Sequence, residues 1–311
     1  MGRFKTVATS LLALCIVMLA ASAAVAANRD SAVTLWYTQP AARWTEALPL
    51  GNGRLGAMVF GSQPVERLQL NEESLWAGRP CDAYPDHFRE HLTELQQLVL
   101  EGKIDTARQL GLEKLTKSPT SYRSFEPLTD LWIETPEGKD SITDYCRDLN
   151  LATGVATVTY ASQGVHFRRE VFISAVDDVL VVRLTADKPG AVAATIRLSR
   201  KKDMTVTADG KNHLRADGQI VDIAAPAGYD DNPGGSGPGG RHMKFATQLL
   251  VRTRGGSVVA NGDSLVVDGA DAAVLLLTAK TDYNVRLLSF DQSIDPAAEA
   301  EAILAKAAKK S

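Results

Sequence analysis

Residues 165–174 read Val-His-Phe-Arg-Arg-Glu-Val-Phe-Ile-Ser, and this stretch decides the fold class. The apolar residues Val165, Phe167, Val171 and Ile173 alternate with polar neighbours. A period of two directs one face of an extended strand toward a core and the other face toward water. The stretch therefore predicts a half-buried β-strand.

The same signal recurs on both sides of this stretch. Residues 192–198 also alternate, and residues 179–184 form a nearly unbroken apolar run, as expected of a strand covered on both faces. Further strand-like segments continue the series at 245–253, 256–260 and 272–278, and turn residues separate the strands at Asp177-Asp178 and at 261–263. Many strands without intervening helices predict a mainly β chain, an antiparallel sandwich of stacked sheets.

A short helical insertion is predicted within residues 85–115. Apolar residues recur at helical spacing from Phe88 to Val99, and Gly102 lies where a C-terminal cap belongs. A second short helix is predicted over residues 104–115. Both helices interrupt the series of strands without changing the fold class.

The alanine-rich segment 296–309 predicts a further helix close to Ser311. We expect a helix at this place to have little to pack on, which suggests that more protein once followed it. Residues 291–311 are therefore interpreted as the start of a C-terminal linker helix, and the chain as truncated, a fragment or a retained module.

The amino-terminal residues predict an export signal. Arg3 and Lys5 precede the apolar residues 11–20, which are followed by the small residues 21–27. This apolar run is shorter than the roughly 20 residues that a membrane-spanning helix needs. We expect residues 1–26 to be a signal peptide, residues 27–290 to be one sandwich domain, and the mature protein to be periplasmic or extracellular with no membrane attachment.

Charge excludes one class of partner. The 311 residues contain 34 Lys plus Arg and 37 Asp plus Glu, and the net charge is −3. Such a chain lacks the basic surface that binds a phosphate backbone, so we expect no nucleic acid partner. The oligomeric state is left open by the sequence.

Two cysteines remain after removal of the signal peptide, Cys81 and Cys146. In an oxidising compartment they form one disulfide or stay as two separate buried thiols, and both alternatives remain open because pairing depends on distance. Neither has the Cys-x-x-Cys spacing of a zinc or redox site.

Gly51, Gly53 and Gly56 form a Gly-x-Gly-x-x-Gly motif that does not predict a dinucleotide site. Cofactor binding needs a strand before this motif and a helix after it, whereas residues 57–60 are strand-like and residues 46–50 contain a proline. We interpret the motif as a tight turn entering a strand, and we expect no cofactor.

His87, Glu90 and His91 match a zinc-peptidase pattern on the predicted helix. Three residues match such a pattern often by chance, and both histidines are expected on the solvent side of the apolar stripe. We therefore interpret them as a solvated helix face and expect no metal.

The segment from Glu46 to Gly78 is unusually rich in side chains that carry chemistry. Five residues within it are the candidate site residues: Asn52, Arg54, Asn71, Glu72 and Trp76. Amides, a carboxylate and an indole together suit a carbohydrate-facing surface, because sugars offer apolar faces for stacking and hydroxyls for planar polar partners. The structural alternative is that Trp44 and Trp76 close the end of the sandwich while Asn71 and Glu72 bond to turn backbone.

Several motifs of the mature chain carry a resemblance to a known family. They are Trp36-Tyr37, Leu48-Pro49-Leu50-Gly51-Asn52-Gly53-Arg54-Leu55-Gly56, Leu70-Asn71-Glu72-Glu73-Ser74-Leu75-Trp76-Ala77-Gly78 and Pro127-Leu128-Thr129-Asp130-Leu131-Trp132. Together they resemble the amino-terminal signature of glycoside hydrolase family 95, the α-L-fucosidase family. The resemblance implies an amino-terminal β-super-sandwich that is followed by a helical linker and an (α/α)6 barrel.

The resemblance also implies where catalysis takes place. The family's general acid glutamate and its asparagine-assisted aspartate belong to the barrel, and no position here matches them, so no catalytic residue is assigned. The chain is expected to be the non-catalytic amino-terminal domain of an exported, inverting fucosidase-like glycosidase that meets fucosylated or related glycans through the missing barrel. The five candidate residues would then border the substrate cleft or lie in the interface between domains. The alternative is a free-standing carbohydrate-binding or interaction module.

Overall fold

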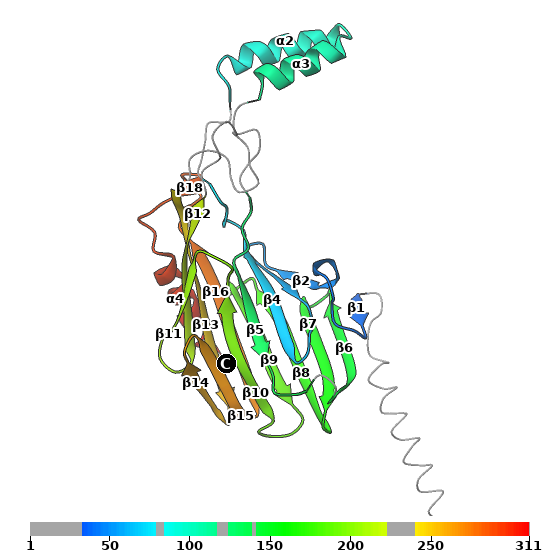
Figure 1. The fold of residues 1–311 in the computed structure, drawn as a ribbon, viewed down its shortest axis with the longest axis vertical. Coiled ribbons are helices and arrows are strands. Elements are labelled where there is room, and N and C mark those ends of the chain that lie inside the picture. The colour runs from blue at the N-terminus through cyan, green and yellow to red at the C-terminus, as the bar shows by residue number, and fades with distance from the viewer. Residues whose placement is uncertain (1–32, 79–83, 117–123, 139–140, 223–239, 311) are drawn as a thin grey trace, which may run out of the picture.

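The computed structural model describes residues 33–78, 84–116, 124–138, 141–222 and 240–310. Two large antiparallel sheets lie against each other and make up most of this part of the chain (Figure 1). The predicted fold class, a mainly β antiparallel sandwich, is confirmed. The predicted signal peptide, residues 1–26, lies outside the described residues, and the predicted domain boundaries stay predictions.

The larger sheet has nine strands. In spatial order they are β1 (Thr34–Tyr37), β6 (Ile142–Asn150), β7 (Val155–Ser162), β8 (Val165–Ser174), β9 (Val179–Ala186), β16 (Ala272–Thr281), β13 (Gly240–Arg254), β12 (His213–Asp222) and β11 (Met204–Ala208). Residues 165–174, whose alternation predicts a half-buried strand, form β8, the fourth strand in this order.

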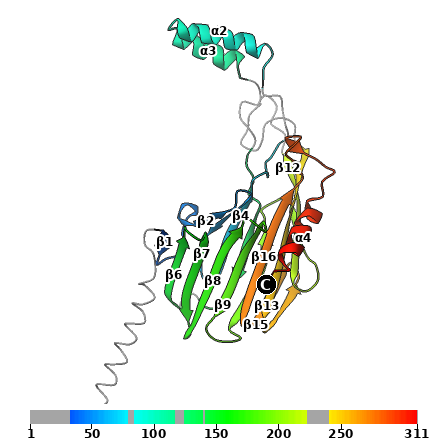
Figure 2. The same ribbon diagram turned by 180° about the vertical axis from the view of Figure 1, so that it is seen from behind.

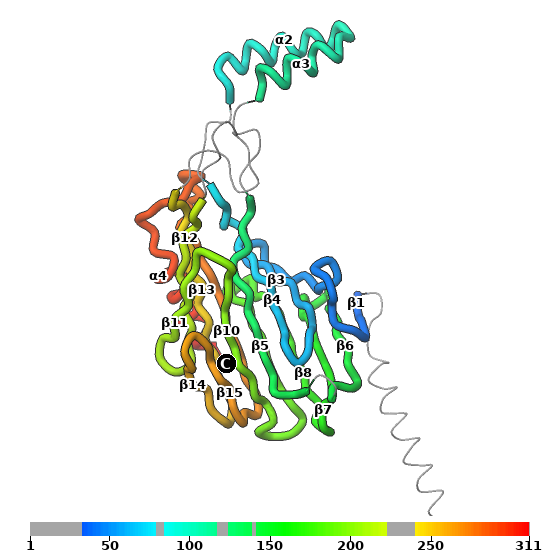
Figure 3. Tube along the Cα trace, viewed as in Figure 1, coloured from blue at the N-terminus to red at the C-terminus, as the bar shows by residue number. Residues whose placement is uncertain are grey.

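The smaller sheet has seven strands. In spatial order they are β14 (Ser257–Asn261), β15 (Ser264–Ala270), β10 (Val192–Ser199), β5 (Thr129–Glu134), β4 (Val65–Glu72), β3 (Leu55–Val59) and β2 (Leu48–Gly51). Strand β5 thus lies between two strands that are distant in sequence, β4 and β10, as the colours of the tube show (Figure 3). A two-stranded ribbon, β17 (Tyr283–Asn284) with β18 (Ser289–Phe290), and a 3-10 turn, η1 (Trp44–Glu46), complete the β part.

The core lies between the two sheets. Buried residues alternate with half-buried ones along β10 and β5, and their inward side chains join those of the nine-stranded sheet in one continuous apolar cluster. Ile196 and Leu131 from one sheet and Leu249 and Leu275 from the other are fully buried in it. The period-two pattern of the sequence is therefore the pattern of burial.

One buried ion pair interrupts this core. Glu66 of β4 and Arg169 of β8 lie on different sheets, both are buried, and their side chains form a hydrogen-bonded ion pair. Glu66 Oε1 also accepts a hydrogen bond from the Gly61 amide at 3.0 Å, and Arg169 Nη2 donates a hydrogen bond to the Ser62 carbonyl at 3.1 Å. Burial raises the pKa of Glu66, while the nearby Arg169 charge acts in the opposite direction. The pair joins the two sheets at a point where the sequence of β8 breaks its apolar series.

Helix α4 (Pro296–Ala307) covers the outer face of the nine-stranded sheet (Figure 2). Leu304 and Ala308 pack there against Leu276, and Val181 and Leu250 lie beside this contact. Ala300 is fully buried by the same packing. The predicted helix is confirmed, but the expectation that it has little to pack on is wrong, because apolar side chains of β9, β13 and β16 point outward beneath it. Val181 also explains the nearly unbroken apolar run of β9.

Helices α2 (Phe88–Leu100) and α3 (Ile104–Lys114) pack side by side and stand away from both sheets (Figures 1 and 3). Both predicted helices of the insertion are confirmed, and Gly102 has a φ of 76° between them. Of their side chains, only Ala107 is fully buried. In the described part of the chain, no helix is both long and apolar enough to cross a membrane.

Replacement of Glu66 by alanine tests the buried pair. We expect Glu66→Ala to lower the free energy of unfolding by about 3–5 kcal/mol, because Arg169 would be left buried without its counter-charge. Chemical denaturation measures this loss.

The matched control is Glu134→Ala on the neighbouring strand β5. Glu134 pairs with Arg197 at 2.8 Å, but both side chains are 38% exposed. Exposed pairs contribute about 1 kcal/mol or less, so the control is expected to change stability little. Equal losses in the two variants would contradict the role assigned to the buried pair.

Candidate functional site

The glycine motif forms a tight hairpin turn at one end of the sandwich. Strand β2 ends at Gly51 and β3 begins at Leu55, and Gly53 between them has a φ of 96°, a conformation that favours glycine. Asn52 Oδ1 accepts hydrogen bonds from the backbone amides of Arg54 at 3.0 Å and Leu55 at 2.8 Å. The structure thus confirms a turn that enters a strand.

Arg54 extends from this turn to the opposite sheet. Its Nε donates to Asp178 Oδ2 at 2.6 Å, one terminal nitrogen donates to the Ala279 carbonyl at 2.5 Å, and the other donates to Thr278 Oγ1 at 3.2 Å. Its own sheet supplies Glu72, with 3.4 Å between Nη1 and Oε1. We call Asn52, Arg54, Glu72, Asp178 and Thr278 the Arg54 clasp.

Asp178 is the acceptor that holds the clasp on the nine-stranded sheet. It lies in the turn between β8 and β9 with a left-handed φ of 60°. Asn52 Nδ2 donates to Asp178 Oδ1 at 2.9 Å, and Thr278 Oγ1 donates to the Asp178 carbonyl at 2.8 Å. An aspartate tolerates this backbone better than most residues do, so its carboxylate is fixed between two donors.

Glu72 is buried at the end of β4, and its two oxygens have different partners. Oε1 faces Arg54, while Oε2 accepts hydrogen bonds from the amide of Ser74 at 2.8 Å and from its hydroxyl at 2.6 Å. The Ser74 hydroxyl in turn lies 2.5 Å from Thr281 Oγ1 of the other sheet. Glu72 therefore has the turn-bonding role that the sequence offered as its structural alternative.

Asn71 is not part of the clasp. It is half-buried and lies opposite Gly56 in the β3–β4 pair. Because successive side chains of a strand point to opposite faces, Asn71 and Glu72 face opposite sides of the sheet. The structure thus places Asn71 on the face opposite to the Arg54 clasp.

Trp76 lies beside the clasp on the surface. Its side chain is 45% exposed, its ring lies 5.2 Å from that of Phe125, and its Nε1 donates to the Glu73 carbonyl at 3.1 Å. Trp44 is 57% exposed. The interpretation that these two tryptophans close the end of the sandwich is wrong, because both indoles remain at the surface instead of entering the core.

Asp178 and Thr278 are not among the site residues predicted from the sequence. The pair Asp177-Asp178 indicated only a turn, and Asp178 is 124 residues away from Arg54 in the chain. The available signal was that Asp178 is a carboxylate at a turn position with left-handed backbone. Nothing in the sequence indicated that Arg54 is its partner.

The other residue of that pair, Asp177, contacts the carboxyl-terminal part of the chain. Lys310, which follows helix α4, forms an ion pair with Asp177. This hydrogen bond from Lys310 is the main cause that lowers the pKa of Asp177. Neighbouring residues of one turn thus bind Arg54 and the last described lysine, so the clasp and the carboxyl-terminal helix share a point of attachment.

Asp282 is a second buried carboxylate near the clasp, one residue beyond Thr281. Its Oδ1 accepts a hydrogen bond from the Lys244 amide at 2.9 Å. Burial raises the pKa of Asp282 to about 6, against the lowering effect of the Lys244 hydrogen bond and charge. No functional role for Asp282 was expected from the sequence.

The remaining candidates are placed as follows. Cys146 is half-buried on β6 and Cys81 lies outside the described residues, so the two alternatives, one disulfide or two separate thiols, both stay open. His87 and His91 face the helix carboxylates Glu90 and Glu94 at 3.4 and 3.7 Å. Among the residues that the structure describes, no group of three or more His, Cys, Asp or Glu could hold a metal ion.

Exchange of Arg54 for lysine tests the clasp. Lysine keeps the charge, but its single nitrogen cannot replace the three guanidinium nitrogens that bond Asp178, Thr278 and the Ala279 carbonyl, so we expect Arg54→Lys to lower the free energy of unfolding by about 2–3 kcal/mol. Arg43→Lys is the control, because Arg43 is 76% exposed in its pair with Glu46. The control is expected to stay within about 0.5 kcal/mol of the unsubstituted chain, and an equally small effect of Arg54→Lys would refute the clasp.

The pKa of Asp282 predicts a pH dependence of stability. Because the folded state holds this proton more tightly than the unfolded chain, the stabilisation is complete below pH 3.8 and is lost as the pH rises through about 6. The loss amounts to at most about 3 kcal/mol. Asp282→Asn is expected to remove this component, so that the variant gains stability relative to the parent at pH 7 but not at pH 3.5.

Glu101→Gln is the control for this experiment. Hydrogen bonds from Gln97 and Lys103 lower the pKa of Glu101, so its contribution has the opposite sign: it is present above the ordinary carboxyl pKa and is lost as the pH falls. Urea unfolding at a series of pH values measures both variants. An unchanged pH profile of Asp282→Asn would show that this carboxyl does not titrate as described.

Comparison with known proteins gives relatives among glycosidases. Alpha-L-fucosidase 2 of Arabidopsis thaliana is 31% identical over 280 residues, which are 85% of this chain and 32% of that protein. Probable alpha-fucosidase A of Aspergillus oryzae is 31% identical over 176 residues, or 55% of this chain and 23% of the relative. The same-named protein of Aspergillus niger is 33% identical over 174 residues, 54% of this chain and 22% of the relative. The chain thus spans about a third or less of the length of these relatives.

Among solved structures, a putative kojibiose phosphorylase from human microbiome aligns with a TM-score of 0.45 and 10% identity, over 91% of this chain and 36% of that chain. The sequence model of the glycosyl hydrolase family 65 N-terminal domain matches residues 35–286, from strand β1 to just beyond β17. This match covers nearly all of the sandwich, and the chain therefore belongs to the family of glycosyl hydrolase family 65 N-terminal domains.

Proposed function

We propose that this chain is the non-catalytic amino-terminal domain of an exported α-L-fucosidase-like glycosidase of family 95. The observation that carries the proposal is its 31% identity with Alpha-L-fucosidase 2 over 85% of the chain. That alignment includes far more than the signature motifs that first indicated the resemblance. Fucosylated or related glycans are the substrate class proposed for the whole enzyme.

The chemistry of the clasp supports a non-catalytic role. Glycoside hydrolysis needs two carboxyl groups on either side of a sugar, about 5–10 Å apart, one of which must give up a proton. Glu72 and Asp178 both face the Arg54 guanidinium and accept further hydrogen bonds, and Glu72 is buried. Neither is free to protonate a glycosidic oxygen. We therefore propose that catalysis depends on a further region of the enzyme. The relatives have space for such a region, because this chain spans about a third or less of their length.

The position of the clasp supports a role at a domain interface. Lys310, just beyond helix α4, binds the turn that also holds Arg54. A catalytic region that continued from this helix would begin beside the clasp. The exposed Trp76 and Phe125 lie at the same end of the sandwich, so we propose that they, rather than the inward Glu72, contact that region.

A free-standing carbohydrate-binding module is the second candidate, and the Trp76–Phe125 pair favours it. The rings are tilted by 58° at 5.2 Å, and the two residues are 45% and 38% exposed. Exposed aromatic faces of this kind stack against the apolar faces of sugars. Both candidates place the glycan at this end of the sandwich, and turnover separates them.

Turnover of a nitrophenyl α-L-fucoside tests the proposal. The chain without residues 1–26 is expected to show no hydrolysis above background. The same chain joined to the catalytic region of the Arabidopsis relative is expected to hydrolyse the fucoside, because the missing acid and base would then be supplied. Hydrolysis by the chain alone that Glu72→Gln abolishes would overturn the proposal.

Single substitutions in the joined protein locate the interface. Trp76→Ala is expected to lower kcat/KM or the melting temperature, and the exposed Trp44→Ala, on the 3-10 turn, serves as the matched control. If Trp76→Ala and Trp44→Ala both leave the two quantities unchanged, the Trp76 surface does not contact the catalytic region. Specific fucoside binding without turnover in the joined protein would favour the binding module.

A further inference from the structure

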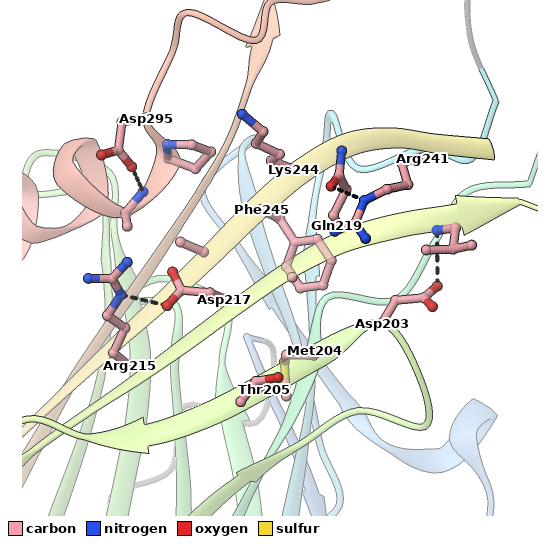
Figure 4. Close-up of a pocket in the computed structure, with 15 residues that line it drawn as sticks. Asp203, Met204, Thr205, Arg215, Asp217, Gln219, Arg241, Lys244, Phe245 and Asp295 are labelled. Atoms are coloured by element: carbon pink, nitrogen blue, oxygen red, sulfur yellow. Dashed lines mark hydrogen bonds and ion pairs between the residues drawn. The ribbon is translucent and has the colours of Figure 1, made fainter.

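A pocket lies on the outer side of the nine-stranded sheet, apart from the Arg54 clasp. It is bounded by β11, β12, β13 and the residues that begin helix α4 (Figure 4), and its volume is about 580 Å³. This volume is within the roughly 300–1,000 Å³ typical of small-molecule sites. None of the candidate residues from the sequence lines it.

The polar side chains of the pocket are fixed by bonds to one another. Arg215 Nε donates to Asp217 Oδ2 at 2.6 Å along β12. Arg241 Nε donates to Gln219 Oε1 at 2.8 Å across β13 and β12 (Figure 4), and Gln219 Nε2 donates to the His242 carbonyl at 2.9 Å. Both guanidiniums bond through Nε, at the base of the fork, so their terminal nitrogens extend beyond these pairs. A ligand would therefore meet polar groups whose positions are already set.

The charges around the pocket balance. The three cations are Arg215, Arg241 and Lys244, and the three carboxylates are Asp203, Asp217 and Asp295. Asp295 Oδ1 caps helix α4 by accepting a hydrogen bond from the Ala297 amide at 3.0 Å, so the helix start is already occupied by an anion. A balanced lining gives an anionic ligand no electrostatic preference over a neutral one.

The rest of the lining is mostly apolar and of mixed size. It consists of Met204, Thr205, Gly218, Val221, Phe245, Ala246, Pro296 and Ala297. A neutral sugar matches this combination, because its hydroxyls pair with planar guanidinium, carboxylate and amide groups while its C–H faces contact the apolar side chains. We propose that this pocket is a second glycan-binding site that takes a neutral oligosaccharide.

This site goes beyond the proposed function, since it needs no catalytic region. It would hold a glycan on the sandwich at a place separate from the Trp76 surface. Failure of the pocket to bind sugar would leave the proposed role in a larger glycosidase intact, because turnover of the joined protein tests that role.

Isothermal titration of the chain with fucosyllactose, maltotetraose and cellotetraose tests the site, and tetragalacturonate serves as the anionic comparison. We expect saturable binding of at least one neutral oligosaccharide. Gln219→Ala and Arg241→Ala are each expected to weaken it at least about tenfold, because each removes a polar partner of the sugar. Arg241 is exposed, so its variant is expected to keep the parent melting temperature.

Two control variants locate the binding. Arg168 of β8 forms a comparable surface pair with Glu170 at 2.9 Å, and Arg168→Ala is expected to bind as the parent does. Trp76→Ala is likewise expected to bind normally. The proposal is overturned by the absence of saturable binding to all three neutral sugars, by binding of tetragalacturonate alone, or by a loss in Trp76→Ala that Gln219→Ala and Arg241→Ala do not share.

Discussion

Arg54 provides the polar connection between the sheets on which this end of the sandwich depends. Apolar packing holds two sheets together without direction, whereas a guanidinium has five N–H donors in a fixed plane and therefore sets how the sheets meet. Arg54 is 16% exposed, and it binds Asp178 and Thr278 of one sheet while facing Glu72 of its own. Partial burial strengthens these charge-assisted bonds relative to a surface pair.

Two further contacts follow from that connection. On one side, the turn that presents Asp178 also presents Asp177, which binds Lys310 beyond helix α4. On the other side, Glu72 positions Ser74, whose hydroxyl meets Thr281 next to the buried Asp282. Three of the five candidate residues, Asn52, Arg54 and Glu72, therefore make contacts that hold this end of the sandwich together. The exposed Trp76–Phe125 pair lies outside these contacts.

Local patterns predict local structure well here, and pairings between distant segments much less well. Alternation in residues 165–174 indicated β8, because burial on one face of a strand imposes a period of two. Arg169 breaks that alternation, yet only the fold shows that Glu66 is its partner. Likewise, Asn52 and Arg54 were recognisable as unusual, but Asp178 is far away in the chain and nothing local indicates it. Helix α4 was predicted, and the apolar run of residues 179–184 predicted a strand covered on both faces, but nothing local indicates that this helix provides the cover.

A double-mutant cycle between Arg54 and Asp178 tests the central claim most directly. Arg54→Ala, Asp178→Asn and the double variant would be unfolded in urea beside the parent chain, with asparagine chosen because it tolerates the left-handed backbone at this turn. A clasp that joins the sheets predicts a coupling free energy of about 1.5–3 kcal/mol between the two positions. Additive losses, with coupling below about 0.3 kcal/mol, would show that Arg54 does not join the sheets through Asp178.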